Sequence, residues 1–278
     1  MALTPGERLD RAIREWLSSQ GRSVSIREVR RALSEGQILV NGRTTAPGAR
    51  ARGDEELEFG DFLPRDESRI ESEPELPLTV LADWPDLVAV DKPSGMPCAP
   101  LRPRERGTLV GAVVARYPEI ADAGPPLEGG LAHRLDNETS GIVLIAKTLE
   151  ARRWLRRSFR EHRVEKSYLA RTSPRALPRE LDLPIYSAGA RVRCGPDGLE
   201  AYSAFDVEAR RDDAQLVRVR TRFGRRHQVR VHLAEAGAPI DGDAVYGGSL
   251  APRLMLHAAT LRLPDDREVE APLPEALW

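Results

Sequence analysis

The pattern of apolar and polar residues predicts two short helices near the start of the chain. Apolar residues recur at helical spacing in each, first at Leu9, Ile13, Trp16 and Leu17, then at Ile26, Val29 and Leu33. Thr4-Pro5-Gly6-Glu7 predicts a capped start for the first helix, with Thr4 as cap and Pro5 at the first helical position. Ser25 with Glu28 predicts a capping box for the second helix, and Gly36 predicts its end.

Two short strands are expected after these helices. The first, ILV at 38–40, runs into Asn41-Gly42, the pair most typical of a two-residue hairpin turn. Gly53-Asp54 indicates another turn before a strand at 57–59. We therefore expect a small αβ domain over residues 1–62. Residues 63–77 combine many acids with proline and show no sustained period, a composition typical of a linker.

Residues 78–278 are expected to form a second, larger domain of short strands and helices. The predicted strands are 87–90, 142–146, 166–172, 201–208 and 216–223, and the predicted helices are 109–117, 149–163 and 227–235. Because helices and strands do not alternate regularly, the pattern favours an α+β fold with a mixed, largely antiparallel central sheet and flanking helices. Arginines at 218, 220 and 222 alternate with apolar residues and predict a strand with a basic outer face.

Length and composition agree with two globular domains. The 278 residues are 41% hydrophobic, enough for a core. No apolar run approaches the roughly 18 residues of a membrane span, and MALTPGERLD is unlike a secretory signal. Cys98 and Cys194 lie far apart without metal-like spacing, so a reduced, cytoplasmic protein is expected, with a disulfide as the alternative.

The charge is distributed unevenly, although the formal net charge is only −1. Of 42 basic residues, three are lysine, so 42 − 3 = 39 are arginine. Arginine is dense at 152–163 and 218–230, whereas acids concentrate at 61–75. Composition bias accounts for much of this arginine, yet forked guanidinium donors also suit phosphate, so the clusters indicate a polyanionic partner.

Most catalytic patterns are missing from the sequence. His227 and His232 are five residues apart without Cys or HExxH, which excludes a catalytic metal on spacing, and no GxSxG or nucleotide-binding glycine motif is present. No metal and no nucleotide cofactor is therefore expected. Asp136 and Glu138 could form a carboxylate pair for glycoside hydrolysis, but sequence does not fix their separation. Asp136 is the remaining candidate, crowded by polar residues just ahead of a predicted strand.

Several ordered segments resemble the RluA-type pseudouridine synthases. HRLDNETSG (133–141) resembles the hallmark segment of that family, and the other blocks follow in family order. They are DKPSGMPCAP (91–100), KSYLA (166–170), FGRRHQVRVHLAEAGAPIDGDAVYGG (223–248) and LMLHA (254–258). The resemblance covers most of residues 78–278 and implies the pseudouridine synthase fold and isomerisation of uridine in RNA. Asp91, Phe223 and Arg226 depart from the usual family residues, the last two near the expected cleft.

The resemblance also implies roles for individual residues. Asp136 is the expected nucleophile, attacking either carbon 6 of uracil or carbon 1′ of ribose, and Arg230 is its expected cationic partner. Tyr168 is expected to stack on the flipped base and to assist removal of the proton from carbon 5. Arg134 is expected to fill the gap that the base leaves. Around the substrate we expect His133, Arg225, His227 and Leu256, with the histidines serving as hydrogen-bonded packing residues.

Residues 1–62 resemble the S-four RNA-binding domain through RLD (8–10), SIREVRRALSEG (25–36), ILVNG (38–42) and GD (53–54). An ordinary αβ module with a solvated arginine face is the alternative. Five arginines are expected to contact RNA: Arg27, Arg30, Arg31, Arg153 and Arg157. The expected partner is RNA, ribosomal rather than transfer RNA, and a monomer is the default. Two rival functions remain, a non-catalytic RNA-binding or ribosome-assembly factor that retains the synthase fold, and a glycosidic hydrolase.

Overall fold

The computed structural model describes residues 3–19, 24–59, 70–189 and 191–278. The chain divides into two compact units, one up to Arg69 and one from Ile70 onward. Within the predicted linker, residues 63–69 lie outside the described residues. Ile70 is buried in the second unit, where Glu73 accepts hydrogen bonds from the backbone of Gly107 and Thr108. The second unit therefore begins ahead of residue 78.

The first unit contains two helices and a two-stranded antiparallel sheet. The helices are α1 (Leu9–Ser19) and α2 (Ile26–Ser34), and the strands are β1 (Ile38–Val40) and β2 (Leu57–Phe59). Leu9, Ile13 and Leu17 on α1 pack against Val29 and Leu33 on α2, so both predicted apolar stripes form one core. The capping box of Ser25 and Glu28 is present, which confirms the predicted start of α2.

The predicted start of the first helix was wrong, because α1 begins at Leu9 and not after Thr4. Gly6 has φ +83° and donates its N–H to the Ala51 carbonyl at 2.8 Å. The Ala51 N–H in turn donates to the Glu7 carbonyl at 2.8 Å. The segment before α1 therefore pairs with residues near Ala51, and this pairing occupies backbone groups that a helical turn would need.

The Asn41-Gly42 turn forms, but the hairpin is shorter than predicted. Both residues have positive φ, 52° and 71°, as a type I′ turn requires. Beyond the turn, Arg43 makes only an isolated bridge to Val40. The main partner of β1 is β2, which arrives after the Gly53 turn, so tertiary pairing outweighs the local hairpin preference.

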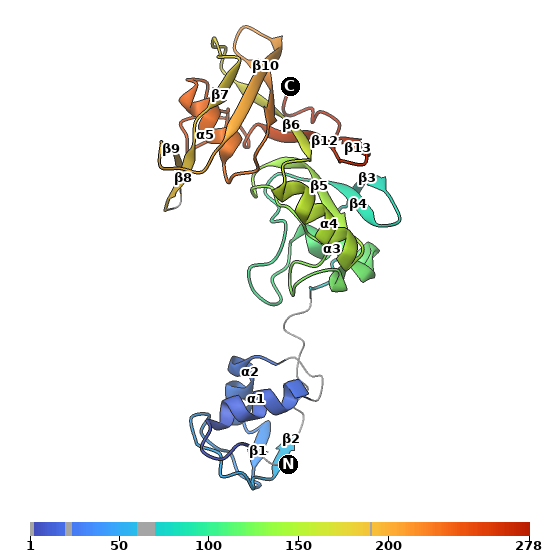
Figure 1. Ribbon diagram of the computed structural model, residues 1–278, viewed down its shortest axis with the longest axis vertical. Helices are drawn as coiled ribbons and strands as arrows, with labels where there is room; N and C mark the ends of the chain where they lie inside the picture. Colours follow the sequence, from blue (N-terminus) through green and yellow to red (C-terminus); the bar gives the residue numbers. More distant parts are fainter. Residues whose placement is uncertain (1–2, 20–23, 60–69, 190) are drawn as a thin grey trace. The chain divides into compact units, whose positions relative to one another are not determined.

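The second unit is built on a nine-stranded mixed sheet (Figure 1). Its strands are β3 (Thr79–Asp83), β4 (Leu87–Lys92), β5 (Ser140–Ala146), β6 (Glu165–Thr172), β7 (Glu180–Asp182), β10 (Tyr202–Arg210), β11 (Gln215–Thr221), β12 (Leu256–Arg262) and β13 (Glu268–Glu270). The order is β3-β4-β5-β12-β6-β11-β10-β7, with β13 on β12. Among the strands that the structure describes, β5–β12 is the one parallel pair, which confirms the predicted mixed, largely antiparallel sheet. A separate hairpin joins β8 (Ile185–Ala188) to β9 (Arg191–Cys194).

Four helical segments accompany this sheet: α3 (Leu109–Arg116), the short 3₁₀ helix η1 (Pro118–Asp122), α4 (Leu149–Arg160) and α5 (Gln228–Glu235). All three predicted helices and all five predicted strands of this unit are present. Six strands, β3, β7, β8, β9, β12 and β13, were not predicted. Most are short and partly exposed, so they carry little apolar periodicity. Among the described residues, no helix is long and apolar enough to cross a bilayer.

Strands β4 and β5 lie between two helices. On one face, Val90 and Val143 pack against α3 residues such as Val113. On the other face, Ala89 and Leu144 pack with Leu155 of α4. Because both faces are covered, every residue of β5 is buried, which explains its continuous apolar run. This rigid strand fixes the end of the loop that precedes it.

The predicted basic face of β11 is largely neutralised. Arg218 pairs with Glu208, and Arg220 pairs with Asp206, both on the neighbouring strand β10. These cross-strand ion pairs leave fewer free charges than the arginine spacing alone indicated.

Candidate active site

Asp136 lies in the loop between Leu131 and β5, and buried Lys92 holds this loop in place. The Lys92 side chain is 0% exposed. Its ammonium donates to the carbonyls of Pro93, Met96 and Asn137 at 2.9, 2.8 and 2.8 Å. All three N–H donors are thus used, one of them on the residue next to Asp136. The pKa of Lys92 is lowered to about 8 by burial, and the charge of nearby carboxylates such as Glu138 opposes this decrease.

Further contacts join the 94–98 segment to the same loop. The Gly95 N–H donates to the Asn137 carbonyl at 2.9 Å, and the Ser94 hydroxyl donates to the Glu138 carbonyl at 2.6 Å. The Leu135 N–H donates to the sulfur of Cys98 at 3.4 Å. On the loop side, these contacts all involve backbone atoms, so none of them uses the Asp136 side chain.

The Asp136 carboxylate faces two side chains, Arg230 in α5 and His227 at the N-cap position of that helix. Nη1 of Arg230 lies 3.6 Å from Oδ2 of Asp136, and Nε2 of His227 lies 3.9 Å from the same oxygen. The Asp136 side chain is 27% exposed, whereas that of Arg230 is 8% exposed. The carboxylate is therefore accessible to a ligand while its cationic neighbour is buried.

Asp243 orients the guanidinium of Arg230 through two hydrogen bonds. Nε and Nη2 of Arg230 donate to the two carboxylate oxygens of Asp243 at 2.7 and 2.8 Å. Asp243 also accepts N–H bonds from Val245 and Tyr246 at 3.0 and 3.2 Å. Burial alone would lower the pKa of Arg230, but hydrogen bonds and charge from Asp243, together with the Asp136 charge, raise it. The guanidinium is therefore fixed and charged, with Nη1 left for Asp136.

A hydrogen-bond chain joins β9 to His227 through Tyr246. The Tyr246 hydroxyl accepts the Val192 N–H at 2.9 Å and lies 2.9 Å from Nδ1 of His227. When this hydroxyl donates to Nδ1, neutral His227 carries its proton on Nε2, the nitrogen that faces Asp136. Burial lowers the pKa of His227, an effect that Asp136 opposes, so the imidazole is neutral at pH 7.

Tyr168 on β6 lies within the electrostatic reach of Asp136. Burial, together with the Asp136 charge, raises the pKa of Tyr168 to about 12. The phenol therefore stays protonated over the physiological range. Such a group offers a flat ring and an O–H donor rather than a ready base.

Comparison with known proteins identifies the family of this arrangement. The sequence model of the family described as RNA pseudouridylate synthase matches residues 86–235, more than half of the chain. The chain belongs to this family. The match spans the Asp136 loop, β6 and α5, so the site described above lies largely within the shared domain of this synthase. The family assignment and the mixed sheet confirm the resemblance to RluA-type synthases.

Relatives and solved structures agree with this assignment. A protein of Chloroflexus aurantiacus named "Uncharacterized RNA pseudouridine synthase" is 35% identical, covering 98% of this chain and 88% of its own. The "Ribosomal large subunit pseudouridine synthase D" of Vibrio parahaemolyticus is 29% identical over 97% of this chain and 88% of its own. The solved human "RNA Pseudouridylate Synthase Domain Containing 1" has a TM-score of 0.58 and 25% identity, covering 70% of this chain and 83% of that chain.

The other residues expected around the substrate of this synthase differ in accessibility. Arg134 is exposed beside Asp136. His133 is a packing residue, since its Nε2 accepts the Leu144 N–H at 2.8 Å and burial, with Lys166, lowers its pKa to about 3. Arg225 donates to the Glu200 carbonyl at 3.0 Å. Leu256 is 3% exposed within the core that includes β6 and β11.

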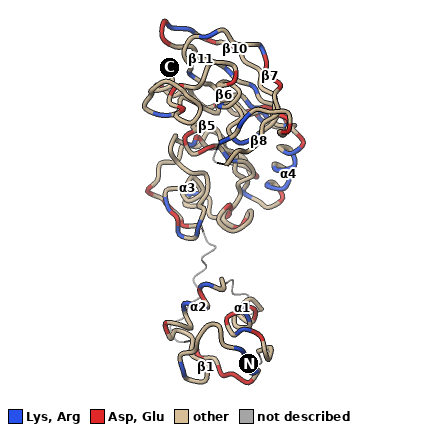
Figure 2. Tube along the Cα trace, turned by 90° about the vertical axis from the view of Figure 1, so that its left-hand side faces the viewer, with Lys and Arg blue, Asp and Glu red and all other residues tan. Residues whose placement is uncertain are grey.

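The arginines expected to contact RNA are also in different environments. On α2, Arg27 is exposed, Arg31 lies 4.0 Å from Glu35, and Arg30 donates to buried Asp10 at 2.6 Å. Arg30 therefore stabilises its own unit as well as offering charge. On α4, Arg153 and Arg157 belong to a helix with basic residues along its length (Figure 2). Arg153 and Arg157 are both exposed.

Arg152, the first residue of the arginine-dense stretch 152–163, is not available to a polyanionic partner. Arg152 is 6% exposed, and its guanidinium donates to the Leu131 carbonyl and to Glu128 at 2.7 and 2.9 Å. It supports the chain that leads to the Asp136 loop. The exposed arginines of α4 therefore begin at Arg153.

Sequence reasoning missed Lys92, Asp243 and Tyr246 as parts of the site. Lys92 had one available signal, as one of three lysines among 42 basic residues, immediately before Pro93. Asp243 and Tyr246 lie inside the 223–248 segment, but no spacing rule relates them to Arg230 or His227. Among the described residues, no group of His, Cys, Asp and Glu is arranged to hold a metal ion, and both cysteines are free.

Proposed function

We propose that this synthase isomerises uridine in ribosomal RNA, with Asp136 as the nucleophile. The observation that carries the proposal is a partly exposed carboxylate that faces a buried, charged guanidinium at 3.6 Å. A buried cation favours the ionised form that a carboxylate nucleophile needs. The names of relatives such as the Vibrio parahaemolyticus protein support ribosomal over transfer RNA as substrate.

The reaction rearranges one bond of the nucleoside. The bond from uracil N1 to ribose C1′ breaks, and a bond from uracil C5 to C1′ forms. The proton on C5 is lost to solvent, and N1 takes up a proton, so the product is an isomer of the substrate. Asp136 attacks either C6 or C1′, and in both routes it is regenerated when the rearranged uridine is released. The target base must leave its stack to reach the loop.

Three neighbours of Asp136 receive roles in this proposal. Arg230 faces the carboxylate with a fixed positive charge and offsets the charge that moves during attack. Tyr168 stacks on the uracil ring, and its protonated hydroxyl donates to the base. His227 directs its Nε2–H towards Asp136 and orients the carboxylate without competing for its charge.

Exposed arginines are proposed to bind the RNA backbone. Arg134 takes the space of the flipped base, while Arg153 and Arg157 on α4 contact phosphates. The first unit, with Arg27 exposed on α2, is proposed to act as an S-four-like RNA-binding domain. The protein is proposed to work as a cytoplasmic monomer.

The test uses RNA carrying tritium at carbon 5 of uridine, taken from a strain that lacks this gene. We expect the wild type to release tritium, and Asp136→Asn to lose about a thousandfold or more in rate while it still binds the RNA. Equal release by Asp136→Asn would exclude a nucleophilic role for Asp136. Binding without release by the wild type would favour the non-catalytic RNA-binding function, and release of free uracil would favour hydrolysis.

A further inference from the structure

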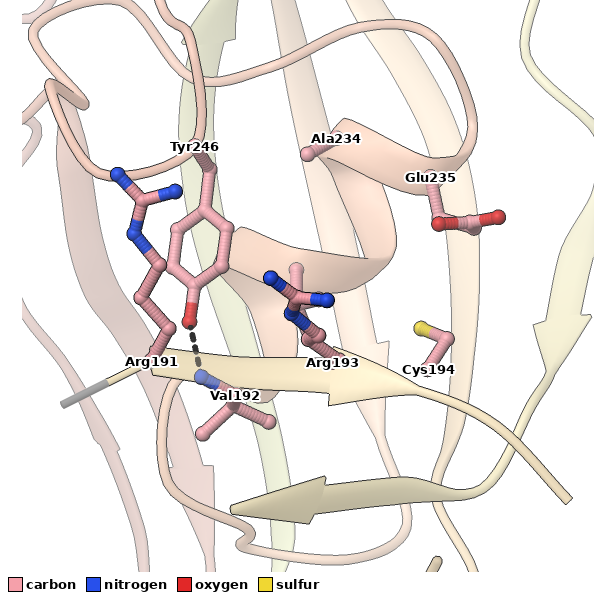
Figure 3. Close-up of a pocket in the computed structure, with 8 residues that line it drawn as sticks. Arg191, Val192, Arg193, Cys194, Ala234, Glu235 and Tyr246 are labelled. Carbon is pink, nitrogen blue, oxygen red and sulfur yellow. Dashed lines mark hydrogen bonds between the residues drawn. The ribbon is translucent and has the colours of Figure 1, made fainter. Parts of the chain in front are cut away.

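A pocket of about 320 Å³ lies between β9 and α5 of the second unit (Figure 3). Strand β9 (191–194) lines one side, Val231, Ala234 and Glu235 of α5 line the other, and Tyr246 contributes its ring. This volume is at the lower end of the range for small-ligand pockets, about 300 to 1,000 Å³. None of the roles proposed above uses the pocket.

The charge around the pocket is available to an anion. Arg191 and Arg193 alternate along β9, and both side chains extend on the side of the strand that carries Tyr246 (Figure 3). In residues 70–189 and 191–278, neither guanidinium has an ion pair with a carboxylate, in contrast to Arg218 and Arg220 on β11. Charges that the fold does not neutralise are the ones that a phosphate can use.

Arg226 adds a third guanidinium and holds the hairpin. Its Nη2 donates to the carbonyls of Gly189 and Arg191 at 3.0 and 3.2 Å. These bonds place a cation on the β8–β9 hairpin, beside the pocket residue Arg191.

Only two side chains separate the pocket from Asp136. The pocket residue Tyr246 hydrogen-bonds to His227, and His227 lies 3.9 Å from the Asp136 carboxylate. An RNA strand that delivers its uridine to Asp136 brings the neighbouring nucleotides into this region. The phosphates of that strand would meet Arg191 and Arg193.

We propose that the pocket binds a nucleotide flanking the target uridine, with its base between β9 and α5 and its phosphate on Arg191 and Arg193. This inference rests on the proposed function, since it assumes that an RNA strand reaches Asp136. Val231, Ala234 and the Tyr246 ring provide apolar surface for the flat base, and the exposed Glu235 carboxylate accepts from a base amino group. The pocket thereby contributes to the choice of which uridine is modified.

The test compares two pocket variants with a matched control. Arg191→Gln/Arg193→Gln removes the charges, and Ala234→Phe fills the pocket without changing charge. The control is Arg210→Gln, which alters an exposed strand arginine on β10, outside the pocket. Each is assayed for tritium release from ribosomal RNA labelled at carbon 5 of uridine, and for binding of the same RNA on filters.

We expect both pocket variants to raise the KM for RNA and weaken binding about tenfold, with kcat changed less than about twofold. The charge variant should also bind RNA with a shallower dependence on salt. The slope of log affinity against log salt concentration should decrease by about 0.7 for each phosphate that the variant no longer neutralises. The control should match the wild type in every measurement. If Ala234→Phe and the charge variant both behave like Arg210→Gln, the pocket is not an RNA subsite.

The two assays separate this inference from the proposed reaction. If the wild type releases tritium and the pocket variants match it in release and in RNA binding, the subsite is excluded and the proposed reaction is supported. Absence of release, together with about tenfold weaker binding by the pocket variants, supports the subsite and overturns the reaction. If the double arginine variant fails to fold by circular dichroism, Ala234→Phe alone decides the matter.

Discussion

Asp243 holds Arg230 through two hydrogen bonds of 2.7 and 2.8 Å, so the cation that faces Asp136 is fixed by a second, fully buried carboxylate. A single arginine is shared between two acids with different tasks. The bidentate pair with Asp243 determines where the guanidinium lies, and the remaining nitrogen meets Asp136. Other residues around Asp136 are placed by equally specific contacts, and each contact has a measurable consequence.

Replacing Asp243 should damage catalysis through Arg230. In Asp243→Asn the charge-assisted fork is broken, so the guanidinium is free to turn towards Asp136 or away from it. We expect kcat for tritium release to fall about a hundredfold or more, with RNA affinity changed less than about threefold. The matched control is Asp241→Asn, which alters a buried aspartate of the same segment that pairs with Arg171. Equal reductions of kcat in both variants would point to general destabilisation instead.

Removing the Tyr246 hydroxyl should shift the pH dependence of the reaction. In the tautomer of His227 that carries its proton on Nε2, the hydroxyl donates to Nδ1, 2.9 Å away, and so favours the neutral imidazole. Without this donor, Tyr246→Phe should raise the pKa of His227, and a positive imidazolium would then form beside Asp136 at higher pH. The acidic side of the profile of kcat against pH should therefore shift to higher pH, by less than about one pH unit. Tyr202→Phe, which removes an exposed hydroxyl bonded to Glu180, should leave the profile unchanged.

Removing the Lys92 ammonium should loosen the Asp136 loop. Lys92→Met leaves three carbonyls without their donor, so we expect a decrease of about 2 to 5 kcal/mol in the free energy of unfolding and a lower kcat. Urea titration measures the first, and tritium release the second. Lys147→Met, which removes an ion pair with the exposed carboxylate of Asp83, should cost less than Lys92→Met, because Asp83 can be solvated once its partner is removed.

The same lysine predicts the sign of a pH effect on stability. The pKa of Lys92 is lowered from 10.5 to about 8 in the folded protein. Between these values the unfolded chain binds more protons, so the contribution of Lys92 to stability should increase as pH rises from about 8 towards 10.5. The free energy of unfolding of the wild type, minus that of Lys92→Met, should therefore increase over this range. A constant difference would mean that the pKa is not lowered.

In the first unit, Asp10 should govern stability in acid. Its carboxylate lies between Arg8 and Arg30 at 3.0 and 2.6 Å, with its side chain fully buried. Burial would raise the pKa of Asp10, but hydrogen bonds from both arginines outweigh it and lower the pKa to about 2. The stability that Asp10 contributes is present above about pH 4 and should disappear as pH falls through about 2.

Asp10→Asn should reproduce this destabilisation at neutral pH. We expect peptides from α1 and α2 of the full chain to exchange backbone hydrogens about tenfold faster or more, as mass spectrometry would show. The control is Glu15→Gln, which alters an exposed pair with Arg14 at 3.7 Å. Unchanged exchange in Asp10→Asn would show that the ion pairs do not stabilise this unit.

Sequence patterns identified the parts of this fold that are regular and well buried. The continuous apolar run of β5 and the stripes of α1 and α2 were sufficient, because burial on a regular element produces a readable period. The start of α1 could not be predicted correctly, since the Gly6–Ala51 contact joins segments far apart in sequence. β12 was missed as a strand because nearly all of its residues are buried, so its sequence, LHAATLR, shows no regular alternation of apolar and polar residues.

Site residues could be predicted where they belong to a recognisable sequence motif. Residues that meet only through the tertiary fold could not. The family resemblance pointed to Asp136 and Arg230, which the fold brings within 3.6 Å. Nothing in the chain pattern relates Asp243 to Arg230 or Val192 to Tyr246. These partners meet only after the loop beyond α5 and the β8–β9 hairpin have folded beside α5. The roles assigned to Tyr168 and Arg134 stay predictions.

The Asp136 loop is held through its backbone atoms, and this has a consequence for how the protein can change. On this loop, the bonds from Lys92, Ser94 and Gly95 go to the carbonyl groups of Asn137 and Glu138. Both of these residues are exposed, and their side chains take no part in those bonds. Substitutions there should therefore be tolerated by the fold, which leaves two positions beside a fixed carboxylate where new RNA preferences could arise without disturbing the reaction.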